Sequence, residues 1–225
     1  MKLHFHPAST TSRMVQMFAM DQGVNLDYQV VDMFTGEHHK PAYAALNPSC
    51  LVPALQDGDF TLCESAAILR YLAEKSGSPA YPKDLQARAK VNEMMDWLNS
   101  NLYKDLAYGM IYPQLFPHHR RPDDTVHAGS IAWGRDKARH WLQILDERLI
   151  GPDKAYLCGA QISLADYMGA EMILLAETLI GCDLSGYRNV SRWLKNMKAL
   201  PAWKPVHEAV EGFGASLKGK SFVTL

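Results

Sequence analysis

The sequence lacks the features that mark membrane proteins and nucleic-acid-binding proteins. It contains no run of about 18 uninterrupted apolar residues, the length at which a membrane-spanning helix becomes a candidate. Its formal net charge of -1 provides no basic surface to attract phosphate backbones or anionic lipids. We therefore expect no nucleic-acid partner, no membrane partner and a cytoplasmic location.

Cysteine is also scarce, with four residues at Cys50, Cys63, Cys158 and Cys182. Their wide spacing matches no zinc-binding pattern, and they lie within or beside apolar runs. We expect these residues to be reduced thiols in the protein core, and we expect no metal site.

What is present is the composition of an ordinary globular protein. Hydrophobic residues make up 48% and charged residues 21% of 225 residues. This length allows one large domain or two ordinary ones with a self-sufficient core, and no internal repeat suggests an array.

The first part of the chain shows an alternation of strands and helices. Residues 3–6 alternate with period two until Pro7, which predicts a strand, and hydroxyl residues 9–12 precede a helical pattern that ends at Gly23. A second strand is expected at 26–33, followed by a loop or short helix.

A hairpin and a further helix are expected next. Short strands at 52–56 and 60–62 flank Asp57-Gly58, a strong signal for a tight turn. Glu64-Ser65 then begins a helical pattern that ends near Gly77. The resulting order is β-α-β-α-β-β-α.

The second part of the chain shows helical patterns without a convincing strand. Residues 78–87 are rich in turn formers and are expected to be a linker between a first domain at 1–77 and a helical bundle at 88–225. Helices are expected at roughly 88–115, 123–149, 163–178, 188–198 and 202–213.

The order of the first domain, with a proline after Val52 at the start of the hairpin, resembles the thioredoxin fold. In that fold this proline follows a cis peptide bond. A thioredoxin dithiol site would carry Cys-x-x-Cys after the first strand, where this sequence has Ser-Thr-Thr-Ser at 9–12. Dithiol redox chemistry is therefore excluded.

Ser9, Val52-Pro53 and Glu64-Ser65 together resemble the glutathione S-transferase superfamily, and the match covers nearly the whole chain. The segments 3–9 and 57–68 are most similar to theta-type enzymes, including bacterial dichloromethane dehalogenases. The resemblance implies a thioredoxin-like domain that binds glutathione as co-substrate and a helical domain that binds an electrophile.

Two of these motifs imply the glutathione-binding residues Val52, Pro53, Glu64 and Ser65. A cis bond at Val52-Pro53 would leave the Val52 N–H and C=O free to pair with the cysteinyl unit of glutathione. The mouth of the helix at Glu64-Ser65 suits the γ-glutamyl carboxylate. The alternatives are a hairpin proline without a ligand and a simple helix cap.

The resemblance implies that Ser9 is the catalytic residue, whose hydroxyl donates to the glutathione sulfur and favours the thiolate. Thr10, Thr11 or Ser12 could take the same role, and Ser9 could be only a helix cap. The resemblance implies that His38 contacts the glycyl end of glutathione, although His39 or Lys40 could replace it. Leu51, which precedes the peptide-pairing residue Val52, is also expected to bind glutathione.

The pocket for the second substrate is expected on the first long helix of the second domain, with the residues Tyr108, Ile111, Tyr112 and Leu115. Such an aromatic stripe is more often part of a core than of a pocket. The basic cluster at 118–121 is expected to be a solvated loop.

The predicted activity is transfer of an alkyl or aryl group to glutathione, in which the thiolate attacks a hydrophobic electrophile. The alternatives are a glutathione-dependent dehalogenase and a non-catalytic binding module. We also expect a homodimer, with a symmetry axis at the apolar residues Val91, Met94, Met95 and Leu98.

Overall fold

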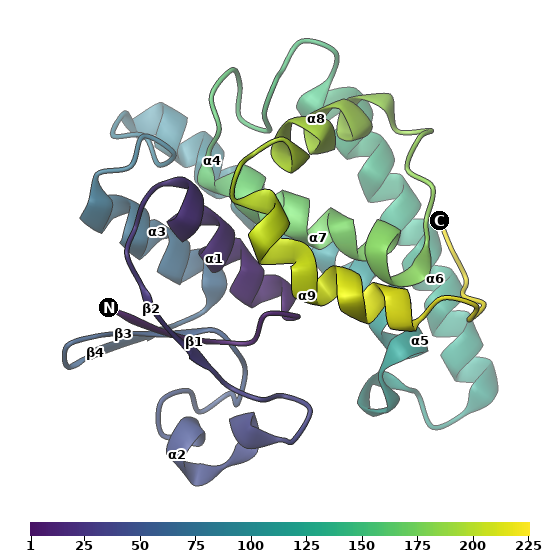
Figure 1. The fold of residues 1–225 in the computed structure, drawn as a ribbon. Coiled ribbons are helices and arrows are strands. Elements are labelled where there is room, and N and C mark those ends of the chain that lie inside the picture. The colour runs from purple at the N-terminus through teal and green to yellow at the C-terminus, as the bar shows by residue number, and fades with distance from the viewer.

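The computed structural model describes residues 1–225 and places a four-stranded sheet at one end of the molecule (Figure 1). The predicted order β-α-β-α-β-β-α is confirmed, except that the second helical region is reduced to two short turns. The elements are β1 (Lys2–Phe5), α1 (Thr10–Asp21), β2 (Asp27–Val30), η1 (Glu37–His39), α2 (Pro41–Ala44), β3 (Ala54–Asp57), β4 (Phe60–Cys63) and α3 (Ser65–Ser76).

The sheet has the strand order β2-β1-β3-β4, in which β1 is parallel to β2 and antiparallel to β3. Leu3 on β1 is opposite Tyr28 on one side and Leu55 on the other, and both leucines are fully buried. The hairpin prediction is confirmed, since Asp57 pairs with Phe60 and Gly58 adopts the positive φ that a tight turn requires.

The second half of the chain is entirely helical, as predicted. Its first three segments form one uninterrupted helical stretch, because the cap of each segment keeps right-handed helical dihedral angles. They are α4 (Leu85–Trp97), the π-helical segment η2 (Leu98–Ile111) and α5 (Tyr112–Leu115). The other elements are η3 (Pro117–His119), α6 (Asp124–Ile144), η4 (Leu145–Ile150), α7 (Leu164–Ile180), α8 (Arg188–Lys198) and α9 (Trp203–Ser216).

The expected linker overlaps the first of these helices. Helix α4 begins at Leu85, because the Asp84 side chain accepts from the Ala87 N–H and caps it. The irregular segment between α3 and α4 is therefore shorter than the expected range 78–87.

A single hydrophobic core runs through both halves of the molecule. Helix α1 lies between the sheet and α7, which is buried along nearly its whole length (Figure 1). The ring of Phe18 on α1 meets the edge of Tyr167 on α7, with centroids 5.4 Å apart. The start of α7 has a capping box, in which Ser163 and Asp166 exchange hydrogen bonds. No helix is long and apolar enough to cross a bilayer.

The residues expected at a dimer axis lie elsewhere. Val91, Met94, Met95 and Leu98 belong to the chain's own core, where α4 and η2 pack against α7, so they cannot form a surface for a second copy. The apolar face of α4 points inward, where it packs against the apolar surface of α7.

The cysteine prediction is partly wrong. All four cysteines are free, but only Cys182 is buried, while the other three are partly exposed.

Helices α6 and η2 approach each other closely at a pair of glycines. A Cβ added to Gly134 would lie 2.4 Å from the carbonyl carbon of Gly109, which is closer than any ordinary contact. The atoms nearest to this Cβ all belong to the backbone of Gly109, so no flexible side chain could move away. Only glycine therefore fits at position 134.

We expect Gly134→Ala to lower the free energy of unfolding by roughly 1–3 kcal/mol or more, because the two helices must separate. Gly129, on the same helix, is the matched control because an added Cβ there meets nothing within 4 Å. Gly129→Ala should leave stability unchanged or raise it by about 0.4–1 kcal/mol. Urea unfolding of both variants measures the difference, and equal stability would contradict the close crossing.

Candidate active site

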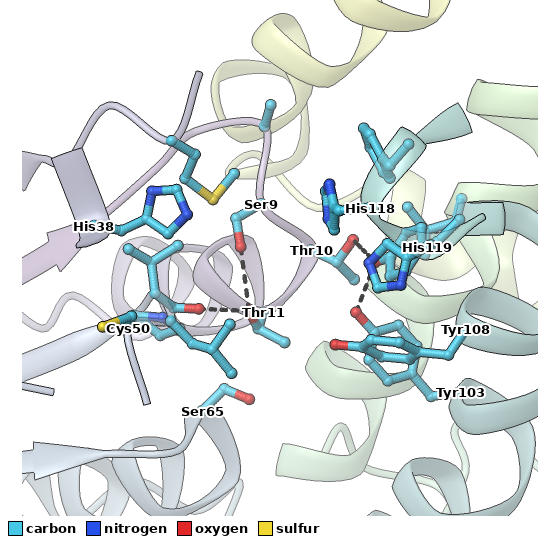
Figure 2. A pocket seen from close by; sticks show the side chains of 18 of the residues that line it. Ser9, Thr10, Thr11, His38, Cys50, Ser65, Tyr103, Tyr108, His118 and His119 are labelled. Atoms are coloured by element: carbon cyan, nitrogen blue, oxygen red, sulfur yellow. Dashed lines mark hydrogen bonds between the residues drawn. The ribbon is translucent and has the colours of Figure 1, made fainter. Parts of the chain in front are cut away.

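A cavity of about 1050 Å³ lies between the sheet domain and the helical part of the chain. In Figure 2, Ser9, Thr11 and Ser65 lie opposite the side chains of Tyr103, Tyr108 and His119. Every residue predicted to bind glutathione or activate its thiol lines this cavity, namely Ser9, His38, Leu51, Val52, Pro53, Glu64 and Ser65.

The N-terminus of α1 brings hydroxyl groups to the cavity wall. Ser9 is the N-cap, and its Oγ accepts from the Ser12 N–H at 3.4 Å and lies 3.1 Å from the Thr11 Oγ1. Thr11 donates its only hydroxyl proton to the Val52 carbonyl at 2.9 Å, so Ser9 is the donor in the Ser9–Thr11 pair. The Ser9 proton therefore has to turn away from Thr11 before it can reach a ligand.

The other hydroxyl candidates divide into two groups. Ser12 is fully buried, its Oγ accepts from the His6 N–H at 3.3 Å, and it does not line the cavity. Thr10 and Thr11 do line the cavity, together with Ser9. The sequence alone could not show which of these hydroxyls face the cavity, because that depends on how α1 is rotated about its axis.

The loop before β3 presents backbone groups to the cavity, and the Val52-Pro53 bond is cis, as predicted. The Val52 N–H makes no hydrogen bond within the chain, but its carbonyl accepts from Thr11, so the expectation that both groups are free is wrong for the carbonyl. The Leu51 carbonyl accepts from the Tyr43 hydroxyl and the Asn47 amide, both at 2.7 Å. These bonds fix the loop in place.

The N-terminus of α3 is the second polar wall. Ser65 is the first residue of α3 and is buried, its hydroxyl has no partner in the chain, and the helix N–H groups before Ile68 have no carbonyl partner. Glu64 precedes it at φ 68°, a left-handed conformation that is strained in residues other than glycine. Cys50, at φ 54°, is the only other such residue, and it lines the same cavity.

His38 stands on the turn after β2 and faces the cavity from the sheet domain (Figure 2). Its Nδ1 is buried without a hydrogen-bond partner. Burial lowers the pKa of His38, and the neighbouring His39 and His118 lower it further, so the imidazole is neutral near pH 7. It therefore offers a neutral hydrogen-bonding group to a ligand.

The helical wall of the cavity comes from η2 and α5. Asn99, Tyr103, Tyr108 and Tyr112 line it at intervals of four, five and four residues. These intervals are longer than one turn of an α-helix, and the π-helical hydrogen bonds from i to i+5 place these residues along one face. An α-helical reading of the sequence could not predict which residues share that face.

Only half of the predicted second-substrate residues reach the cavity. Tyr108 and Tyr112 line it, but Ile111 is fully buried in the core and Leu115 packs against that core. Tyr103 lines the cavity instead, through the π-helical spacing described above. The four residues form one aromatic and aliphatic stripe in the sequence, of which two face the cavity and two face the core.

Two further features complete this wall, and the first of them differs from the solvated loop expected at 118–121. His118 and His119 both line the cavity, and the His119 ring lies 5.5 Å from the rings of Tyr108 and Tyr112, so this segment is more than a solvated loop. The hydroxyls of Thr10, Tyr112 and Tyr103 form a chain of hydrogen bonds at 3.4 and 2.8 Å. Burial raises the pKa of both tyrosines, which keeps them protonated.

The cavity thus combines a free backbone N–H, a helix N-terminus and a hydroxyl at the start of α1 on one side with an aromatic wall on the other. A family model described as "Glutathione S-transferase, N-terminal domain" matches residues 8–75, and one described as "Glutathione S-transferase, C-terminal domain" matches residues 122–201. The chain belongs to the glutathione S-transferase family. This confirms the resemblance that the sequence motifs suggested.

Relatives within this family match the chain over nearly its full length. Human glutathione S-transferase theta-1 is 33% identical over 99% of this chain and 91% of its own. Glutathione S-transferase D7 of Drosophila melanogaster is 32% identical over 98% and 92%. The structure of human glutathione transferase theta-2, in complex with glutathione and an unknown ligand, has a TM-score of 0.81 at 29% identity over 99% and 92% of the two chains.

We expect Ser65→Ala to weaken glutathione binding roughly 10- to 100-fold, because a hydrogen bond from its hydroxyl to a carboxylate is worth about 1.5–3 kcal/mol. Ser76, at the other end of α3, is the matched control because its hydroxyl donates to the Ala73 carbonyl. Ser76→Ala should leave the affinity unchanged. Isothermal titration calorimetry measures both, and an unchanged affinity for Ser65→Ala would exclude this helix end from the site.

Proposed function

We propose that the protein is a glutathione transferase that forms the glutathione thiolate at Ser9 and directs it at a hydrophobic electrophile. The observation that carries the proposal is the convergence of Ser9, the Val52 N–H and Ser65 on one wall of a cavity whose other wall is aromatic. No feature of the cavity favours a hydrolytic dehalogenase or a non-catalytic binding module.

The glutathione backbone would lie along the sheet side of the cavity. Its γ-glutamyl carboxylate would accept from Ser65 and the first N–H groups of α3, whose helix dipole favours an anion. Its cysteinyl unit would accept from the free Val52 N–H, next to Pro53. Glu64, which is exposed beside Ser65, suits the γ-glutamyl ammonium group by its charge.

The glycyl end of glutathione would lie at the outer edge of this wall. His38 offers a neutral imidazole there, and Leu51 presents a side chain that is 56% exposed. His39 and Lys40 follow directly in the chain and are both exposed, so either could contribute to the same carboxylate.

The thiol would then lie at the N-terminus of α1. The Ser9 hydroxyl would turn from Thr11 to donate to the sulfur, and the positive end of the α1 dipole would add to the stabilisation of the thiolate. The thiol would lose its proton to solvent water. The thiolate sulfur would then attack an electrophilic carbon to form a carbon–sulfur bond, and the leaving group would depart with the electrons of the bond that breaks. Tyr108 and Tyr112 would contact this second substrate.

Each part of the chain has its own role in binding the two substrates. We propose the glutathione-binding domain at 1–77, a connecting segment at 78–87 whose last three residues are already the start of α4, and the domain for the second substrate at 88–225. The free cysteines suit a cytoplasmic location, where thiols stay reduced.

We also propose a homodimer, on the basis of family membership. Light scattering at micromolar concentration should give a mass twice the 25.2 kDa of one chain. A mass equal to one chain would contradict the dimer and leave the activity untouched, since every residue of the proposed site comes from one chain.

We expect Ser9→Ala to raise the thiol pKa of bound glutathione by about one pH unit or more and to lower turnover at neutral pH roughly 10- to 100-fold. The affinity for glutathione should change little, because the Val52 and Ser65 contacts remain. The measurement is the ultraviolet absorbance of the thiolate in the complex as a function of pH.

Two variants serve as controls for this experiment. Ser12→Ala should leave the thiolate titration unchanged, because Ser12 lies outside the cavity. Thr11→Val should also leave it near the wild-type value. If Thr11→Val moves the titration and Ser9→Ala does not, Thr11 is the activating residue and the assignment of Ser9 is wrong.

A further inference from the structure

An arginine, a glutamate and a histidine from three helices meet in the interior of the molecule. Arg13 on α1, Glu171 on α7 and His207 on α9 are each fully buried. The Arg13 Nε donates to one oxygen of Glu171 at 2.8 Å, and the His207 Nε2 lies 2.7 Å from the other. We call these residues the buried triad; it joins helix α1 of the sheet domain to two helices of the second half, which lie beside it in Figure 1.

Arg13 and Glu171 form a buried ion pair. Burial acts to raise the pKa of Glu171, but the Arg13 charge and the hydrogen bonds from His207 and Arg13 outweigh it, so the pKa lies below its usual value and the group is a carboxylate. The His207 Nδ1 lies 2.6 Å from the Trp203 carbonyl. Both ring nitrogens therefore face oxygen acceptors, and both donate only if the ring is protonated.

Such a triad is a poor way to join helices, because burying charges has a large desolvation cost and apolar side chains of similar volume hold helices together as well or better. An apolar group could not make the further contact that Arg13 makes. Its Nη1 donates to the Ala8 carbonyl at 2.8 Å, directly before Ser9.

This contact fixes the peptide group that links Ala8 to Ser9 at both ends. Its carbonyl accepts from Arg13, and its N–H, which belongs to Ser9, donates to the His6 carbonyl at 2.9 Å. Arg13 also lies one turn after Ser9, and its own N–H donates to the Ser9 carbonyl at 3.0 Å. With both neighbouring peptide groups held, the direction of the Ser9 side chain is held as well.

We propose that Arg13 is a positioning residue for Ser9, and that Glu171 and His207 act through it by fixing the direction of its guanidinium group. The second half of the chain thereby sets the geometry of the thiol-activating hydroxyl in the first half. This inference rests on the proposed function of Ser9, and it predicts that residues far from glutathione alter the pKa of its thiol.

The experiment compares Glu171→Gln with Asp166→Asn in the full-length protein. Asp166 is the matched control: it lies on the same helix, is fully buried, and accepts from the Leu157 N–H and the Trp193 Nε1, with no hydrogen bond to α1. The readouts are the thiolate absorbance titration of bound glutathione, the glutathione affinity and the urea unfolding midpoint.

We expect Glu171→Gln to raise the thiol pKa of bound glutathione by about one pH unit, which is a tenfold fall in the ratio of thiolate to thiol, with less than about a twofold change in glutathione affinity. Asp166→Asn should lower the unfolding midpoint and leave the titration at the wild-type value. The double variant Arg13→Met/Glu171→Met removes the paired charges together, so its fold should be retained. It should show the same raised thiol pKa.

The outcomes separate this inference from the function on which it rests. A wild-type protein that binds no glutathione, or that leaves its thiol pKa at the value in water, contradicts the proposed function. A lowered thiol pKa in the wild type that persists in both Glu171→Gln and the double variant overturns the role of the triad alone. An equal rise of the thiol pKa in Asp166→Asn also overturns the role of the triad, because any loss of packing around α7 would then have the same effect.

Discussion

The packing of α1 between the sheet and α7 is the constraint on which the rest of the structure depends. The helix carries Ser9 at its N-terminus, and its buried face joins the two halves of the chain into one core. The cavity forms where this helix end meets the loop before β3 and the mouth of α3. A shift of α1 would therefore move the Ser9 hydroxyl relative to the Val52 N–H and Ser65, which line the same cavity.

The local conformations at the cavity are costly for the chain and are concentrated there. Glu64 and Cys50 are the only residues other than glycine with positive φ, and such positions cost about 1–3 kcal/mol each. The fully buried Arg13, which pairs with Glu171, donates to the carbonyl of Ala8, and Ala8 lines the same cavity. Backbone strain and a buried charge pair next to the same cavity indicate that this region is adapted for binding more than for stability.

The sequence predicted the cavity-lining residues of the sheet domain well and those of the helical wall poorly. Val52-Pro53 and Glu64-Ser65 are local motifs whose geometry follows from a proline and a helix cap, so short segments sufficed to find them. Ile111 was predicted to face the cavity but lies in the core, because the π-helical turns of η2 change which residues share a face. Met94 was expected at a dimer surface, yet the partner of its apolar face is α7, whose position depends on the tertiary fold.

A crystal structure of the protein with glutathione tests the central claim most directly, namely that the thiol is held at the N-terminus of α1. The account predicts the sulfur within about 3.5 Å of the Ser9 Oγ, with the γ-glutamyl carboxylate on Ser65 and the cysteinyl carbonyl on the Val52 N–H. A complex in which glutathione occupies the cavity with its sulfur away from Ser9, or its γ-glutamyl carboxylate away from the start of α3, would contradict the account.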